Sequence, residues 1–286
     1  MTYRRFATPL HAARAAAGGA YLLALAVVAL LFRHPVVLGA VLVALAGAAV
    51  GARSGRTVLR AIRWVVPFAL LMAAINALAS RNGLTVIARL GDWGPLGQAD
   101  VTLEATVYGA LIGVQAIALT ACFAVWSVAV DPDEVLRAFR RVSFHSALTA
   151  TLATRLHWVL MRDASRMTEA LRCRPGAPPG RIALLRAVTA GTLERAVDTA
   201  AALELRGYAG AHRPPRMRRA WSRHDIGFLA AAVALLALAV GACVAGVAGW
   251  GAYPTMHAAH GAGAWLLAAA IVAIAWLPFL DRRGIA

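Results

Sequence analysis

Arginines stand at the ends of two stretches of helical pattern, each just before a residue that breaks a helix. Arg172 and Arg174 precede Pro175, at the end of the first stretch. At the end of the second, Arg206 precedes Gly207. One cation at a helix end needs no function, because it gains about 0.3 to 1 kcal/mol from the helix dipole. A guanidinium can also bind a carboxylate through two hydrogen bonds and keeps its charge without water. The repeated pattern, on a connection that no membrane-spanning role explains, shifts the weight from the dipole effect towards a function for these arginines.

The residue types exclude several kinds of catalysis. All 29 residues counted as lysine or arginine are arginine, so no amine is present for a Schiff base, for pyridoxal phosphate or for a Walker A phosphate loop. Cys122, Cys173 and Cys243 are too far apart in the sequence for a disulfide framework or a zinc pattern. The chain has no HExxH helix and no acidic pair inside an apolar stretch. We therefore expect no catalytic residues, no metal site and no cofactor.

Composition and hydropathy predict a membrane protein. The chain is 60% hydrophobic and 15% charged, with a mean hydropathy of +0.67. A helix needs about 17 to 25 apolar residues to cross a bilayer, because lipid cannot hydrogen-bond to backbone amides. Six stretches, with no charged residue beyond their ends, meet this requirement: 15–32, 35–52, 64–80, 103–130, 226–250 and 264–280. The expected fold is all-α, a polytopic membrane protein with about six transmembrane helices.

The arginines also predict which side of the membrane each connection faces. Apart from Arg33, Arg81 and Arg89, every arginine lies in the two terminal tails, in 51–63 or in 131–225. Because positively charged loops stay in the cytosol, we expect both termini and the long connection to be cytosolic. The N-terminal tail is then a cytosolic start and not a removed leader. The expected regions are a four-span membrane region at 1–130, cytosolic coupling helices at 131–225 and two further spans at 226–286.

The connection 131–225 is too polar to span a membrane, and its pattern predicts helices. Asp131 suits an N-cap and Pro132 a first turn, so a short amphipathic helix should begin there. A second helix is expected over 146–174, ending at the proline and glycine that follow it. Arginines alternate with leucines along this helix, so one side could lie on the membrane surface while the guanidinium groups reach water.

A third helix is expected over 181–206. Gly191 and several alanines would let another helix cross it closely, and Gly207 would supply a left-handed exit. Arg195 lies away from an apolar stripe with helical spacing. The stripe consists of Ile182, Leu185, Leu193, Ala196, Ala200 and Leu203.

The end of the third helix resembles a motif of the transmembrane T component of energy-coupling factor (ECF) transporters, which are bacterial importers of vitamins and transition metals. In that family, two cytosolic coupling helices each end in an Ala-Arg-Gly-like motif. Arg206, Gly207 and Tyr208 match the second motif. Glu204 precedes them, and Leu205 stands where alanine is usual.

Three other stretches extend the resemblance over essentially the whole chain. The first motif is matched only at its arginine, for which Arg174 is the first candidate and Arg172 the alternative. The sequence Thr-Pro-Leu-His at 8–11 resembles the family's opening before its first span, and 131–136 resembles the entry to its coupling region.

The resemblance implies a non-catalytic subunit of an ATP-driven importer, without a cofactor, in the bacterial cell membrane. Two cytosolic ABC ATPases would receive the motif arginines in acidic grooves. A separate membrane protein, the S component, would bind the vitamin or metal ion. The lipid bilayer is the remaining partner. The residues implied in ATPase binding are Arg172, Arg174, Glu204, Arg206, Gly207 and Tyr208.

Other functions remain open on the residues alone. An integral-membrane enzyme acting on lipid would need carboxylates, histidines or a nucleophile near the membrane. A stand-alone permease for a neutral solute would need no intramembrane charge. His257 and His260 have the spacing of one helical turn, but two histidines are weak support for a metal site. Nucleic-acid binding is not indicated, because the arginines are distributed by membrane side.

Some polar and aromatic residues near the spans have structural interpretations. Asn76 and Gln115 are expected to form interhelical hydrogen bonds of about 0.6 kcal/mol, although they could line a substrate path or an S-component contact. The basic run at 213–219 should fix the topology and could bind anionic lipid headgroups. Four tryptophans near predicted boundaries fit an aromatic belt: Trp64, Trp126, Trp250 and Trp276.

Overall fold

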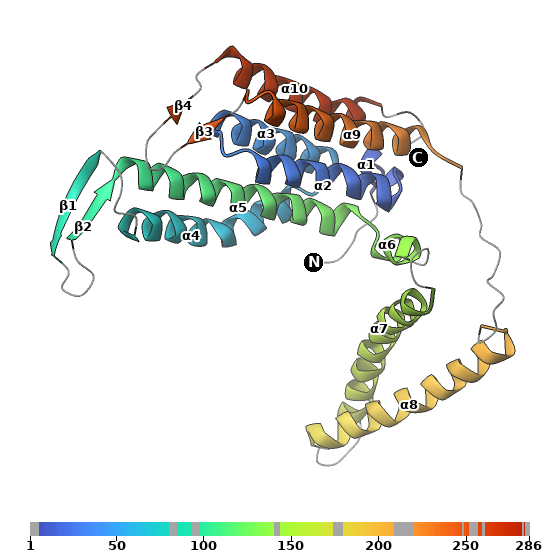
Figure 1. Cartoon of the computed structure of the whole chain (residues 1–286). Coiled ribbons are helices and arrows are strands. Elements are labelled where there is room, and N and C mark those ends of the chain that lie inside the picture. The colour runs from blue at the N-terminus through green and yellow to red at the C-terminus, as the bar shows by residue number, and fades with distance from the viewer. Residues whose placement is uncertain are drawn as a thin grey trace. The chain divides into compact units, whose positions relative to one another are not determined.

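The chain forms two compact units. Figure 1 shows their helices and strands, coloured from blue at the N-terminus to red at the C-terminus. The computed structural model describes residues 6–79, 85–92, 98–139, 144–173, 180–208, 220–247, 249–251, 257–258, 261–281 and 283. The membrane unit comprises Met1–Val135 and Trp221–Ala286, and the coupling unit comprises Leu136–Ala220. The coupling unit is therefore an insertion in the sequence of the membrane unit.

The membrane unit is built mainly from helices. They are α1 (Pro9–Ala12), α2 (Ala15–Leu31), α3 (Pro35–Gly51), α4 (Gly55–Ala79), α5 (Leu103–Ala129), α9 (Arg223–Val244) and α10 (Ala262–Leu280), with α6 (Pro132–Phe139) beginning in this unit. In the described part of the chain, α4, α5, α9 and α10 are long and apolar enough to cross a membrane, and α2 and α3 are shorter apolar helices. The prediction of an all-α polytopic membrane protein is confirmed.

The bounds of two membrane helices differ from the predicted spans. α4 begins at Gly55, well before Trp64 where the predicted span began. The difference arises because hydropathy marks only the apolar part of a helix, whereas arginine is itself a good helix former. α9 ends at Val244, and Trp250, the last residue of the predicted span, lies in a strand.

Two short antiparallel strand pairs were not predicted. β1 (Val86–Asp92) pairs with β2 (Gln98–Thr102), and β3 (Trp250–Gly251) pairs with β4 (His257–Ala258). The first pair connects α4 to α5, and the second connects α9 to α10. The first pair lies in a connection for which hydropathy predicted no structure, and the second begins at the last residue of a predicted span.

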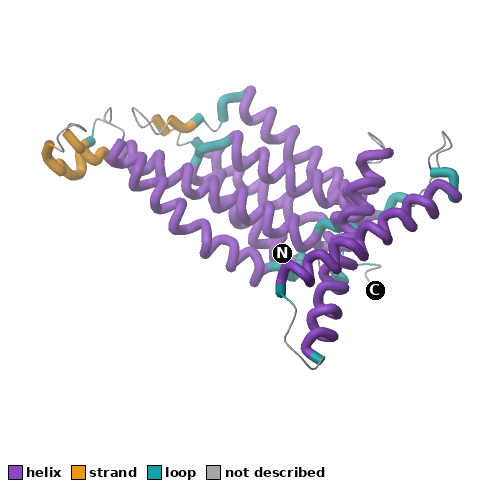
Figure 2. The backbone as a smooth tube through the Cα atoms, turned by 90° about the horizontal axis from the view of Figure 1, so that it is seen from below, coloured by secondary structure: helices purple, strands orange, loops and turns teal. Residues whose placement is uncertain are grey.

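Apart from α1 and α6, the helices of the membrane unit form three layers of two (Figure 1). α4 packs on α5, α2 and α3 form the middle layer, and α9 and α10 form the third. Contacts of α2 with α9 and of α3 with α10 join the middle layer to the third. Figure 2 shows the same helices side by side from a perpendicular direction. The shorter helices α2 and α3 are thus the centre of the unit.

Two glycines of α5 bring its backbone against α4. A Cβ atom at Gly109 would lie 2.8 Å from the Cβ of Asn76 and 2.9 Å from the Cα of Ala73. One at Gly113 would lie 3.1 Å from the Cβ of Ala69. The two glycines are four residues apart on one face of the helix, which is the small-residue pattern that allows membrane helices to pack closely. Larger residues would force α4 and α5 apart.

Glycines of α3 have the same spacing but a different neighbour. Gly47 lies beneath the indole of Trp276, and Gly51 lies beneath the ring of Phe279, both from α10. A Cβ at either position would overlap the ring above it. Likewise, Gly19 of α2 lies under Trp126 of α5. Some tryptophans near the predicted membrane boundaries therefore also pack one helix against another.

Buried polar groups connect the middle layer to its neighbours. The Tyr21 hydroxyl donates to the carbonyl of Ala275 at 2.9 Å. The Gln115 amide donates to the carbonyl of Ala29 at 2.9 Å, so its predicted interhelical bond is confirmed. The prediction was wrong for Asn76, whose amide donates to Met72 within its own helix at 2.9 Å. Gly109 lies directly against the Asn76 Cβ, and the α4–α5 contact there is made by backbone and carbon atoms.

The coupling unit contains two long helices, α7 (Phe144–Arg172) and α8 (Arg181–Leu205). They correspond to the helices predicted at 146–174 and 181–206, and α6 corresponds to the short helix predicted after Asp131. At the start of α6, Asp131 accepts a hydrogen bond from the backbone amide of Asp133 at 2.9 Å, as an N-cap should.

Candidate coupling site

The carboxyl end of α8 closes in a Schellman motif. Gly207 has φ +74°, its amide donates to the carbonyl of Glu204 at 2.9 Å, and the amide of Tyr208 donates to Leu203 at 3.0 Å. These two bonds satisfy helix carbonyls that would otherwise lack partners. The predicted left-handed exit at Gly207 is confirmed. Glycine takes this conformation without strain. The residue before it, Arg206, is the C-cap of α8, and its amide is bonded to the carbonyl of Ala202.

The motif presents its side chains to solvent. Glu204 and Arg206 are exposed, and Leu205 is 91% exposed. Tyr208 is half-buried. An exposed leucine beside an exposed arginine can contribute apolar area and a charge-assisted hydrogen bond to a partner. This helix end has the composition of an interface anchor.

The first arginine motif lies before α8 in the sequence. Arg172 is the last residue of α7, and Arg174 lies outside the described residues. Arg206 follows the last residue of α8. With 1.5 Å of rise per residue, α8 is about 36 Å long. The two motifs are therefore separated in the sequence by the whole of this helix.

The helices α7 and α8 meet at an ion pair. Nη1 of Arg195 lies 2.6 Å from Oδ2 of Asp163, and both side chains are partly exposed. Gly191 and Val188 of α8 and Met167 of α7 line a small cavity of about 230 Å³ beside this pair. A Cβ at Gly191 would meet nothing within 4 Å, so the close crossing predicted at that residue is not observed.

The apolar stripe of α8 does not pack on α7. Three of its residues, Ile182, Leu185 and Leu193, are 66 to 76% exposed. Arg195, which lies away from the stripe, contacts α7 instead. Its partner on α7, Asp163, lies 32 residues away in the sequence, and helical spacing cannot indicate such a pairing.

Much of the apolar surface of the coupling unit is uncovered. Trp158 and Met161 of α7 are 62% and 58% exposed, and Val197 of α8 is 63% exposed. Large exposed apolar side chains on polar helices mark surfaces that bind a protein or a membrane. The exposed faces of α7 and α8 are therefore suited to contact with a protein or a membrane.

The segments that lead into and out of the coupling unit are both fastened to the amino end of α2. Glu134 of α6 accepts a hydrogen bond from the Ala15 amide at 2.8 Å. Asp225 of α9 accepts one from the Arg14 amide at 2.6 Å. We call this arrangement the α2 clasp. Carboxylates are stabilised at the positive end of a helix dipole, so two distant acids take the place of a local N-cap.

Asp225 is the most enclosed member of the clasp. Its side chain is fully buried, and Oδ2 lies 3.2 Å from Nε of Arg14 and 2.9 Å from the amide of Ser222, which donates to it. The Arg14 guanidinium also lies 4.9 Å from the ring centre of Trp221. A buried carboxylate is stable only when its oxygens have such partners. The start of α9 is therefore fixed to the start of α2.

The opening sequence at 8–11 fixes the end of α5. Nε2 of His11 lies 3.3 Å from the carbonyl of Val128, which can only accept, so Nε2 carries the proton. In the neutral ring, Nδ1 then accepts from the Thr8 hydroxyl at 2.6 Å. Both residues are buried. The threonine and histidine thus attach α1 to the last turn of α5, immediately before the coupling region begins.

Metal binding finds no support in the described part of the chain, where no cluster of three or more histidine, cysteine, aspartate or glutamate residues could hold an ion. His260 and the run 213–219 lie outside the described residues. Cys122 is buried, whereas Cys173 and Cys243 are exposed.

A protein-family model matches most of the sequence of this chain. The model is that of the cobalt transport protein CbiQ, and it matches residues 7–217, from α1 to beyond the Schellman motif of α8. The chain belongs to the CbiQ family. This family is the transmembrane component of ECF transporters for cobalt and other micronutrients. No individual curated protein matches the chain.

Membership of the CbiQ family confirms three predictions. The chain is a multi-pass membrane protein, it is a non-catalytic subunit of a transporter, and its resemblance to the T component was correct. The α2 clasp was missed by the sequence analysis. Glu134 was given no partner there, and residue 225 served only as the end of the connection 131–225.

Proposed function

We propose that this CbiQ-family chain couples two cytosolic ABC ATPases to a membrane S component. The observation that carries the proposal is the exposed Arg206 at the Schellman end of α8. The sequence has a second arginine motif before this helix, and a helix about 36 Å long would keep two docking points apart, one for each ATPase subunit.

At each docking point, an arginine enters an acidic groove of an ATPase. Arg206 is suited to this role because its helix end is rigid and Leu205 beside it is 91% exposed. A buried arginine at the centre of an interface contributes about 2 kcal/mol or more. Arg172 or Arg174 fills the corresponding position for the second ATPase.

Movement of the ATPases reaches the membrane helices through the α2 clasp. When ATP closes the two ATPases, α7 and α8 change position, and the load passes through α6 and the start of α9. Glu134 and Asp225 transfer it to the amino end of α2. Because α2 lies in the middle layer, it contacts α3, α5 and α9.

The proposed orientation places the coupling unit and both termini in the cytosol of a bacterial cell. The arginine distribution supports it through the positive-inside rule. The cargo is a micronutrient bound by the S component, and the family description favours cobalt. The exposed apolar side chains of α7 and α8 are the proposed surface for the S component.

Co-purification of the ATPases tests the proposal. Arg206→Glu should reduce ATPase recovery with the chain about 30-fold or more, which corresponds to a loss of 2 kcal/mol. Arg186→Glu is the matched control, because it makes the same charge change on an exposed residue of the same helix. Membrane insertion should be unchanged in both.

Equal recovery of the ATPases with Arg206→Glu and Arg186→Glu would remove the assignment. Arg172→Glu and Arg174→Glu, tested separately in the same assay, identify the arginine of the first site. Turnover of a lipid or passage of a solute by the purified chain, without ATPases, would instead support the enzyme or the permease.

A further inference from the structure

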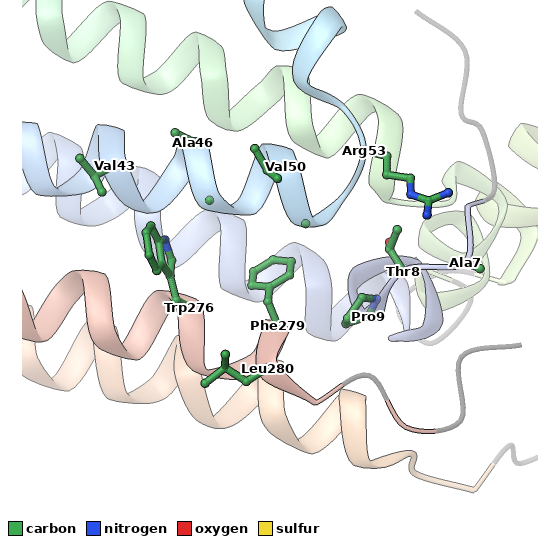
Figure 3. Close-up of a pocket in the computed structure, with 12 residues that line it drawn as sticks. Ala7, Thr8, Pro9, Val43, Ala46, Val50, Arg53, Trp276, Phe279 and Leu280 are labelled. Carbon is green, nitrogen blue, oxygen red and sulfur yellow. The ribbon is translucent and has the colours of Figure 1, made fainter.

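An open groove runs along the membrane unit between α3 and α10. Its volume is about 780 Å³ (Figure 3). Val43 and Val50 of α3 form one wall, and Trp276, Phe279 and Leu280 of α10 form the other. The two glycines of α3 under the aromatic rings let those rings lie close to the helix backbone. The groove is apolar along its length, as expected for a site that faces lipid.

The length of the groove corresponds to one leaflet of a bilayer. It extends along α3 from Val43 to Gly51, a rise of about 12 Å, and then to Arg53 beyond the helix end. Half of a hydrocarbon core is about 15 Å thick. A transmembrane helix of another protein would cross both leaflets, whereas this groove begins near the middle of α3. Its dimension suits a lipid acyl chain.

A cation stands at the mouth of the groove in an unusual backbone conformation. Arg53 has φ +52°, and in the described part of the chain it is the one non-glycine residue with positive φ. Its amide donates to Val50 at 3.0 Å and that of Ser54 donates to Ala49 at 2.9 Å, so α3 ends in a Schellman motif. Glycine would fit this position without strain. Strained backbone is retained where a side chain has a function.

The charge around the mouth is complementary to a phosphate group. Arg53 lines the groove together with Thr8 and Pro9, and Figure 3 shows its guanidinium beyond the end of α3. No ion pair to Arg53 is found among the residues that the structure describes. Arg56 and Arg60, in the first turns of α4, are exposed and add positive charge at this end of the unit.

We propose that the groove binds an anionic phospholipid of the leaflet on the Arg53 side. One acyl chain lies between α3 and α10 against Trp276 and Phe279. The phosphate accepts hydrogen bonds from the Arg53 guanidinium, which binds phosphate oxygens in a bidentate manner. The site depends on the chain lying in a membrane and does not depend on ATPase docking.

Native mass spectrometry of the full-length chain, reloaded with either phosphatidylglycerol or phosphatidylcholine, tests the site. The unaltered chain should retain phosphatidylglycerol about tenfold more strongly. Arg53→Gly should abolish this preference, and Ala46→Trp, which fills the groove from an exposed position, should abolish retention of both lipids. Arg56→Gln is the matched control and should leave the preference unchanged.

Misfolding cannot account for the expected result with Arg53→Gly. Because glycine relieves the left-handed strain, this variant should melt at a higher temperature than the unaltered chain while binding less phosphatidylglycerol. Equal effects of Arg53→Gly and Arg56→Gln would indicate attraction by net charge alone and would overturn the site. Equal retention of the two lipids by the unaltered chain would overturn it as well. The lipid site would also be overturned if another membrane protein co-purified with the unaltered chain and was lost only in Ala46→Trp. A helix of that protein would then occupy the groove.

Discussion

In the membrane unit, Gly109 and Gly113 bring the backbone of α5 directly against α4, whereas in the coupling unit α7 and α8 meet at the partly exposed pair of Asp163 and Arg195. The contact of α5 with α4 runs along the backbones of both helices and involves no other protein. The contact of α7 with α8 leaves Trp158 and other large apolar side chains exposed outside the predicted spans. The difference teaches that the membrane unit packs its helices closely against one another, while the coupling unit leaves apolar surface available to a partner.

The largest effect is expected where the membrane unit buries a charge. Asp225→Ala should lower the free energy of unfolding by about 3 to 5 kcal/mol, because the Arg14 guanidinium loses its buried partner and the start of α2 loses a cap. Thermal unfolding of the chain in nanodiscs measures the effect. Asp198→Ala, an exposed acid of the coupling unit, is the control and should change it by less than about 0.5 kcal/mol. Similar losses in the two variants would contradict the contrast between the units.

A smaller but still large effect is expected at the α4–α5 contact. Gly109→Leu should destabilise the membrane unit by about 1 to 3 kcal/mol, since the new side chain would collide with the backbone of Ala73. Gly39→Leu is the matched control, because a Cβ there meets nothing within 4 Å. Hydrogen exchange should show faster opening of α4 in the first variant only. Unchanged exchange in Gly109→Leu would mean that the two helices pack less closely than described.

The smallest effect is expected in the coupling unit. A double-mutant cycle with Asp163→Ala and Arg195→Ala should give an interaction energy of about 0.2 to 1 kcal/mol, the usual range for an exposed ion pair. The same unfolding measurement in isolated chain provides the value. An energy above about 2 kcal/mol would show that the pair alone sets the geometry of α7 and α8, and the contrast with the membrane unit would then fail.

Local patterns predicted the helices and one of their ends correctly. Gly207 after Arg206 indicated a left-handed exit, and the structure has it at φ +74°. Six apolar stretches located the membrane helices, because lipid imposes a simple requirement on length and polarity. These features depend on residues that are near one another in the sequence, so the sequence alone determines them.

Pairings between distant residues could not be predicted in this way. The amino end of α2 has no side-chain cap of its own, and its partners Glu134 and Asp225 lie more than a hundred residues away. Asp163 and Arg195 pair across two helices. In each case several acids and arginines were available, and only the packing of the helices selects among them.

The α2 clasp has a mechanical consequence. Glu134 and Asp225 attach the two roots of the inserted unit to the consecutive residues Ala15 and Arg14. In the coupling that we propose, a force on either segment would be received at the same end of α2. We therefore expect this helix to tilt about its amino end and not to move along its axis.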